Sequence, residues 1–181
     1  MKGQKKLEWI AEGYRVVSLE GFGSLNVESI GRAIQKNKSS FYHYFGDMEI
    51  FEAELLDYHL ERSRKFADEI ATCEQILPGM VDIFLAYQTD VLFHKRLRFK
   101  RENPAYKACF EKVFKMFEEA VMDKWTMFLD LESNSRLAAT FLHFISENFL
   151  LQITPNTFTA AWMENYLQEV TQLLQQMHSG K

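Results

Sequence analysis

A short segment near the amino terminus holds side chains suited to contacting a nucleic acid. A lysine can pair with phosphate or with the acceptor edge of guanine, serines can hydrogen-bond base edges, and tyrosine and histidine can donate to phosphate oxygens. These side chains are Lys38, Ser39, Ser40, Tyr42 and His43. If the segment is helical, Phe41 and Phe45 lie four residues apart on the inner face and leave the polar groups outside. The pattern predicts a short helix that presents a nucleic-acid-binding surface.

A helix that enters a groove needs a second helix to brace it, and residues 26–34 are expected to form one. Asn26 is a good amino-terminal cap, and Glu28 is favourably placed in the first turn. The side chains expected on its inner side are Val27, Ile30, Ala33 and Ile34. Residues 35–37 interrupt the pattern, and Asn37 can cap the following helix. Residues 26–45 therefore fit a helix-turn-helix, in which the second helix lies in the major groove.

The sequence also resembles a known family over this segment. Residues 39–47, SSFYHYFGD, resemble the recognition helix and exit turn of TetR-type (tetracycline-repressor-like) bacterial regulators. Residues 27–34, VESIGRAI, resemble the second helix of that family, and the likeness extends over residues 7–60. The resemblance implies a homodimeric, ligand-responsive repressor that binds a palindromic operator with two half-sites.

The resemblance matches five residues to DNA-contacting positions: Lys38, Ser39, Ser40, Tyr42 and His43. We also expect Asn26 and Lys36 to contact DNA. Three departures from the family pattern bear on affinity. Gln35-Lys36 replaces Gly-Val at the turn, Gly31 replaces an alanine at a cost of about 0.5–1 kcal/mol, and Met48 replaces a phosphate-binding lysine. Lys36 is the candidate to replace that lost phosphate contact.

Helical periodicity extends through the rest of the chain. Further helices are expected over residues 7–20, 47–72, 80–93, 104–128, 137–151 and 158–177, with a short basic piece at 94–101. We see no strand-like alternation, so the fold class expected is all-α with about nine helices. The domains expected are a helix-turn-helix domain, residues 1–46, and an effector-binding and dimerisation domain, residues 47–181.

Charge and composition restrict the class of protein. Residues 1–46 carry a net charge of +3 and the remainder −7, which suits a protein that meets a polyanion at one end. The two cysteines do not suggest a disulfide framework, and we see neither a secretory signal nor a stretch apolar enough to cross a membrane. A cytoplasmic location without membrane association is expected.

Aromatic and methionine residues are abundant: 16 Phe, 7 Tyr, 3 Trp and 8 Met. Two interpretations stay open for the aromatic stripe of residues 110–128, because such side chains can form an ordinary core or the wall of a ligand cavity. The resemblance implies an effector among the middle helices, and a pocket walled by such side chains would prefer an apolar or aromatic ligand. The pocket candidates are Phe84, Tyr87, Phe110, Phe114, Trp125 and His143.

The last two expected helices carry more apolar surface than one core face needs. Two such helices from each subunit can pack as a four-helix bundle, which predicts a homodimer interface there. Its candidate residues are Phe141, Phe144, Ile145, Phe149, Trp162, Tyr166, Val170 and Leu173. The basic run at 94–101 has two interpretations, a solvated or salt-bridged face, or a segment near the DNA-binding end that couples ligand binding to it or attracts an anionic effector.

Enzymatic motifs are not evident. His143 with Glu147 and Asp90 with His94 are spaced i, i+4 on a helix, but two ligands do not make a metal site. No glycine-rich phosphate loop or nucleophile elbow is present, so we expect no catalysis, no metal and no cofactor. The alternative to a regulator is a ligand-binding or interaction protein of the same fold that has lost specific DNA binding, and Lys36 and Met48 keep that alternative open.

Overall fold

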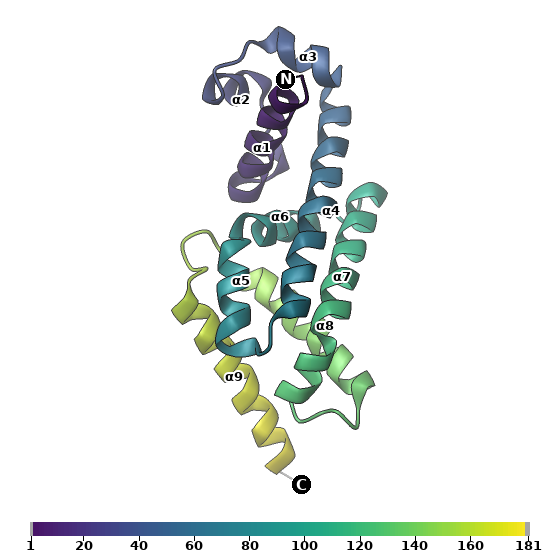
Figure 1. The fold of residues 1–181 in the computed structure, drawn as a ribbon, viewed down its shortest axis with the longest axis vertical. Coiled ribbons are helices and arrows are strands. Elements are labelled where there is room, and N and C mark those ends of the chain that lie inside the picture. Colours follow the sequence, from purple (N-terminus) through teal and green to yellow (C-terminus); the bar gives the residue numbers. More distant parts are fainter. Residues whose placement is uncertain (1, 180–181) are drawn as a thin grey trace. The chain divides into compact units, whose positions relative to one another are not determined.

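The computed structural model describes residues 2–179, and that part of the chain is helical without a strand. The nine α-helices in it are α1 (Lys2–Glu20), α2 (Val27–Ala33), α3 (Lys38–Phe45), α4 (Met48–Thr72), α5 (Val81–Ala86), α6 (Gln88–Arg98), α7 (Pro104–Phe128), α8 (Ser135–Gln152) and α9 (Ala160–Ser179) (Figure 1). A short 3-10 helix, Phe22–Ser24, and a π-helical turn, Ile76–Met80, join them. The predicted all-α class with about nine helices is confirmed.

The early helices begin where the caps were predicted. The side chains of Asn26, Asn37 and Asp47 each accept a hydrogen bond of 2.9 Å from the backbone N–H three residues ahead. Each bond satisfies a donor that the first turn of a helix leaves without an intrahelical partner. These local side-chain contacts explain why the boundaries of α2, α3 and α4 could be predicted from the sequence.

The single helix predicted over residues 80–93 is wrong. Two helices, α5 and α6, occupy this region and are separated at Tyr87, whose backbone leaves the helical conformation (φ −102°, ψ 24°). The Tyr87 hydroxyl donates to Glu69 at 2.6 Å, and the Gln88 amide donates to the Phe158 carbonyl at 3.0 Å. The apolar periodicity continues through this break, because the partners that hold it are distant in sequence.

The predicted basic piece at 94–101 is also placed differently, since its first residues belong to α6. The last predicted helix, 158–177, begins later, as α9 starts at Ala160. Thr154 and Thr157 hydrogen-bond each other's backbone N–H groups through their hydroxyls, at 3.1 and 3.0 Å. This turn occupies the residues before α9 and delays the start of the helix.

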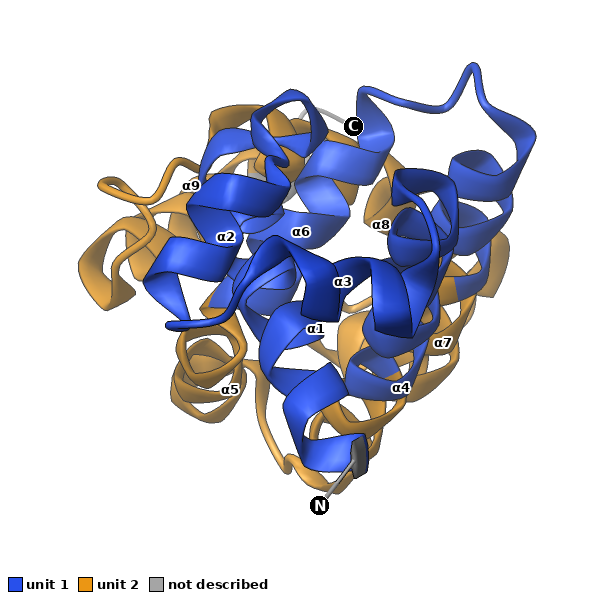
Figure 2. Cartoon of the chain, turned by 90° about the horizontal axis from the view of Figure 1, so that it is seen from above, with its two compact units in different colours: residues 1–63, 89–112 blue, residues 64–88, 113–181 orange. Residues whose placement is uncertain are grey.

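The chain divides into two compact units (Figure 2). The first comprises the described residues up to Ser63 together with Thr89–Lys112, and so contains α1, α2, α3, the first part of α4, nearly all of α6 and the start of α7. The side chains at its core are fully or almost fully buried and are mostly aromatic: Trp9, Tyr14, Phe41, Phe51 and Phe93. They hold the helix-turn-helix on α1 and α4.

The second unit comprises Arg64–Gln88 and the described residues from Val113 onwards. Its core is a chain of ring contacts in which Phe66 meets Phe84, and Phe84 meets Phe149, at centroid distances of 5.1 and 5.7 Å. At another point the Trp125 indole donates a 2.9 Å hydrogen bond to the carbonyl of Ala138, which ties α7 to α8. Aromatic area of this kind gives a large hydrophobic contribution per residue.

The predicted boundary after residue 46 separates a DNA-binding domain from an effector-binding and dimerisation domain, and that division stays a prediction. The compact units divide the chain elsewhere, because residues 47–63 and 89–112 belong to the same unit as α1, α2 and α3. No single described helix is long and apolar enough to cross a membrane, although the consecutive segments Ile76–Ala86 and Gln88–Arg98 together pass that test by length and composition.

Candidate nucleic-acid interface and sensing residues

The turn between α2 and α3 is tight and closed by a backbone hydrogen bond. The Lys36 N–H donates to the Gly31 carbonyl at 2.7 Å. Gln35 adopts a positive φ of 56°, a left-handed conformation that favours glycine. This is the position at which the resembled family carries glycine, so the turn keeps the required backbone shape with a residue less suited to it.

Gly31 permits a close approach of α1 to α2. A Cβ atom added there would lie 2.9 Å from the Trp9 ring and 2.8 Å from the carbonyl oxygen of Lys36. The glycine that appears from the sequence to weaken α2 is therefore required by packing. The prediction that Ala33 lies on the inner side is wrong, since Ala33 is exposed, and Gly31 is buried in its place. Ile34 is half-buried.

The inner face of α3 is aromatic, as predicted. Phe41 and Phe45 are 0% and 3% exposed. The Phe41 ring makes edge contacts with Trp9 and Phe51 at 5.3 and 5.1 Å, and Phe45 meets Phe51 at 4.8 Å. Helix α3 is thus fixed between α1 and α4, which sets the direction of its outer face.

The outer face of the same helix is polar and accessible. Lys38, Ser39, Tyr42 and His43 are exposed, while Ser40 is half-buried and donates its hydroxyl to the Asn37 carbonyl at 2.8 Å. The other two predicted DNA-binding residues lie near by in sequence. Asn26 is exposed and caps α2, whereas Lys36 is half-buried in the turn.

Both lysines beside the α3 cap are paired with carboxylates. Lys36 Nζ lies 3.2 Å from Glu8 Oε2 of α1, and Lys38 Nζ lies 2.7 Å from Glu28 Oε1 of α2. The hydrogen bond from Lys38 lowers the pKa of Glu28, and the same contact raises the pKa of Lys38. The sequence indicated the lysines but not their partners, because these lie on other helices. Met48 begins α4 and is half-buried.

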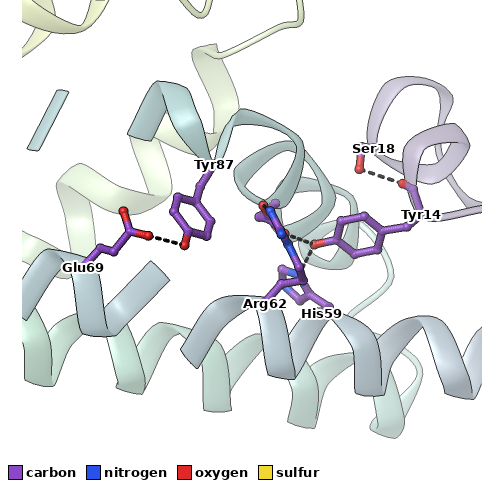
Figure 3. Close-up of polar contacts among 7 residues, drawn as sticks. Tyr14, Ser18, His59, Arg62, Glu69 and Tyr87 are labelled. Atoms are coloured by element: carbon purple, nitrogen blue, oxygen red, sulfur yellow. Dashed lines mark hydrogen bonds and ion pairs between the residues drawn. The ribbon is translucent and has the colours of Figure 1, made fainter. Parts of the chain in front are cut away.

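A buried polar network joins α1, α4 and α6 within the first unit (Figure 3). The Tyr14 hydroxyl lies 2.7 Å from His59 Nδ1 and 2.8 Å from Asp90 Oδ1. Arg62 donates two hydrogen bonds to the two oxygens of Asp90, at 2.9 and 2.7 Å. His59 Nε2 lies 3.4 Å from His94 Nδ1, which extends the network along α6. Asp90 is thus a buried carboxylate with a bidentate partner, a strong arrangement.

Burial sets the ionisation of this network. It lowers the pKa of His59 to about 3, with a further contribution from Arg62, and it lowers the pKa of His94 well below its ordinary value. Burial together with Asp90 raises the pKa of Tyr14. Both histidines are therefore neutral near pH 7. Tyr14, His59 and Arg62 were not predicted from the sequence. The one available signal was Asp90, a carboxylate directly before the apolar residues 91–93.

Part of the basic run contacts α1. Arg96 donates to the carbonyls of Ser18 and Leu19 at the carboxyl end of that helix, where a cation is favourable to the helix dipole. The guanidinium of Arg101 lies 5.0 Å from the centre of the Phe110 ring. The run belongs to the same compact unit as α3. A coupling or effector role for it stays a prediction.

The six predicted pocket residues are distributed over several contacts. Phe84 and Tyr87 both meet Phe66, while the Phe114 ring meets exposed His143 at 5.4 Å. Trp125 is buried against Ala138 of α8. Phe110 belongs to the first unit, where its ring stacks on His94 at 4.3 Å, and the other five belong to the second. Phe84, Tyr87, Phe110 and Trp125 are buried, as in a packed core.

The predicted dimer residues differ in exposure. Phe149, Tyr166 and Val170 are buried within the single chain, and Phe141, Ile145 and Trp162 are half-buried. Phe144 and Leu173 are 65% and 53% exposed. Phe144 also lies in a row with Leu137 and Leu151, at intervals of seven residues along α8, and all three are exposed. The sequence analysis did not single out Leu137 and Leu151.

The residues considered for metal binding have protein partners. Asp90 and His94 belong to the buried network, and His143 faces Phe114. Among residues 2–179, no group of three or more His, Cys, Asp or Glu side chains is arranged to hold a metal ion. No family model matches the chain, and no curated protein or solved structure matches it significantly. Function must therefore be inferred from the chain's own residues and their geometry.

Proposed function

We propose that the protein is a DNA-binding transcriptional regulator, a repressor that binds a palindromic operator as a homodimer and responds to a small apolar or aromatic ligand. The observation that carries the proposal is the two-faced helix α3. Its aromatic side is buried against α1 and α4, and its outer side exposes Lys38, Ser39, Tyr42 and His43. These groups recognise phosphates and base edges, and the preceding tight turn is typical of helix-turn-helix units. The resemblance of residues 27–47 to TetR-type regulators supports the same function.

The exposed apolar row of α8 supports a homodimer. Leu137, Phe144 and Leu151 repeat every seven residues, the spacing that keeps apolar side chains along one seam of a helix. A second copy of the chain would cover this seam by two-fold symmetry. A dimer would present two copies of α3, as an operator with two half-sites about 34–36 Å apart requires.

The course of α4 supports a ligand response. This helix begins directly after α3 and continues without interruption to Thr72, so that it contributes residues to both compact units (Figure 1). A ligand that displaced residues 64–72 would therefore shift the base of the recognition helix. Coupling of this kind typically amounts to about 1–3 kcal/mol.

The alternative function is ligand binding or protein interaction without specific DNA binding. The pairing of Lys36 and Lys38 with glutamates favours it, because both cations beside the α3 cap are partly neutralised within the subunit. Met48, where the resembled family carries a lysine, acts in the same direction.

Selection of bound duplexes from a random DNA pool distinguishes the two functions. A regulator is expected to enrich a palindromic sequence and to lose affinity steeply with salt, because phosphate contacts release counterions. Failure to enrich any sequence, with weak binding throughout, would favour the alternative.

A double variant tests the assignment of the recognition helix. Lys38→Ala with Tyr42→Ala is expected to abolish binding to the selected duplex and to leave the oligomeric state unchanged. The matched control is Lys115→Ala with Met127→Ala, which removes an exposed lysine and an exposed apolar side chain from α7. If the first variant bound DNA as well as the control, α3 would not be the recognition helix.

A further inference from the structure

Lys38, the first residue of α3, forms an ion pair with a carboxylate. Lys38 Nζ lies 2.7 Å from Glu28 Oε1, and Glu28 stands in the first turn of α2. The two side chains are 53% and 59% exposed, so the pair lies on the surface. The carboxylate occupies the kind of position beside the ammonium that a phosphate oxygen would take in a complex.

The fold does not depend on this ion pair. Exposed pairs contribute little to stability, and α2 and α3 are already joined by the hydrogen bond from the Lys36 N–H to the Gly31 carbonyl. Phe41 is fully buried beneath α3. The orientation of α3 can thus be maintained without Glu28, and the pair mainly affects the chemistry of the Lys38 ammonium.

We propose that Glu28 is a positioning residue that holds Lys38 on the outer face of the helix-turn-helix and competes with DNA phosphate for it. This inference rests on the proposed function. A DNA phosphate must displace the Glu28 carboxylate before it binds Lys38. The freed carboxylate then repels the negatively charged DNA backbone. Phosphates carry no sequence information, so this competition weakens binding to every duplex. Glu28 therefore restrains sequence-independent binding.

The competition has a signature in the salt dependence. A lysine that neutralises one phosphate contributes about 0.9 to the slope of log affinity against log salt concentration. Lys38 is already paired with the Glu28 carboxylate in the free protein, so the contribution of Lys38 to this slope is reduced. Removing the Glu28 charge is expected to steepen the slope by up to about one, a change that a purely structural role would not produce.

The test measures binding of a random-sequence 30-base-pair duplex over a range of KCl concentrations. Glu28→Gln is expected to raise affinity at low salt about fivefold and to steepen the slope. The control is Glu12→Gln, which removes the same charge from a 2.7 Å pair with Arg15 on α1. It is expected to change affinity by less than about twofold, and circular dichroism confirms that each variant is folded.

A double-mutant cycle identifies the partner. In a Lys38→Gln background, Glu28→Gln is expected to change affinity by less than about twofold, because the contested ammonium is absent. The inference is overturned if Glu28→Gln weakens binding or changes the affinity no more than Glu12→Gln does. It is also overturned if the effect of Glu28→Gln persists in the Lys38→Gln background. If the unmodified protein shows no salt-dependent binding to DNA, the proposed function is wrong. A protein that binds DNA with salt dependence but is unaffected by Glu28→Gln contradicts only the role given to Glu28.

Discussion

Gly31 illustrates how one residue can be disfavoured by its helix and required by its neighbours. Alanine there would gain about 1 kcal/mol of helix propensity. The added Cβ would lie 2.9 Å from the Trp9 ring, which is fully buried and has little room to move. Packing against α1 therefore outweighs the local preference of α2.

We predict that Gly31→Ala lowers the free energy of unfolding by about 1–3 kcal/mol, the usual cost of overpacking a core. Urea denaturation followed by circular dichroism measures this loss. Gly3→Ala is the control, because Gly3 also lies in a helix but has no atom within 4 Å of its added Cβ. Equal stability of the two variants would contradict the packing argument.

The two buried histidines give the protein a pH dependence. Burial places the pKa of His59 at about 3 and depresses that of His94, whereas an unfolded histidine titrates near 6.5. Tyr14 and Arg62 face His59, and Phe110 and Arg101 lie on the side of His94. Protonation therefore occurs first in the unfolded state. The neutral histidines make their full contribution to the free energy of unfolding above about pH 6.5. That contribution is lost as the pH falls towards the folded-state pKa values.

We predict that the free energy of unfolding falls between pH 6.5 and 4.5, by up to about 1.4 kcal/mol per pH unit for each histidine. Urea titrations at successive pH values measure the slope. His94→Gln is expected to reduce it, because the variant lacks one of the two buried imidazoles. An unchanged slope in His94→Gln would show that other groups cause the acid sensitivity.

At the scale of elements, α6 is bound to α1 at successive turns. Asp90 accepts from Tyr14, Phe93 stacks on Tyr14 at 4.2 Å, and Arg96 caps the carboxyl end of α1. These residues are spaced by three along α6 and so occupy one face of it. The orientation of the helix-turn-helix therefore depends on a helix that lies far along the chain.

Loss of Arg62 is expected to destabilise the protein more than loss of the Tyr14 hydroxyl. Arg62→Met leaves the buried Asp90 without its cation, and removing one partner of a buried pair costs about 3–5 kcal/mol. Because Arg62 is about one-third exposed, we expect the lower part of that range. Tyr14→Phe removes a neutral hydroxyl and should cost about 1–2 kcal/mol. Urea denaturation of both variants checks the order, and the reverse order would contradict the role given to Arg62.

For the whole molecule, the row of Leu137, Phe144 and Leu151 on α8 is an apolar surface that is partly exposed in the single chain. Substitution of Phe144 and Leu151 by glutamate should disrupt the proposed dimer. Each copy would lose about 2 kcal/mol of apolar burial, so we expect the dissociation constant to rise about a thousandfold. Sedimentation equilibrium measures it.

Gln168→Glu adds one charge to an exposed position of α9 and is the control for this experiment. It is expected to leave the dissociation constant within about threefold of the unmodified value. A monomeric unmodified protein, or a dimer insensitive to both glutamates on α8, would contradict the interface assigned to this row.

Features controlled by local interactions could be predicted before the fold was known. The caps at Asn26, Asn37 and Asp47 act over three residues, and the aromatic inner face of α3 follows from the spacing of Phe41 and Phe45. The all-α class and the two faces of α3 could therefore be predicted, because their physical causes lie within one or two helical turns.

Contacts between residues distant in sequence could not be predicted, because they depend on how the helices pack. Tyr14 bonds Asp90 across 76 positions, and Lys38 finds Glu28 on another helix. The break at Tyr87 and the need for glycine at position 31 likewise arise from partners elsewhere in the chain. Periodicity shows which face of a helix is buried, but it carries no information on what covers that face. Those pairings depend on how the helices pack.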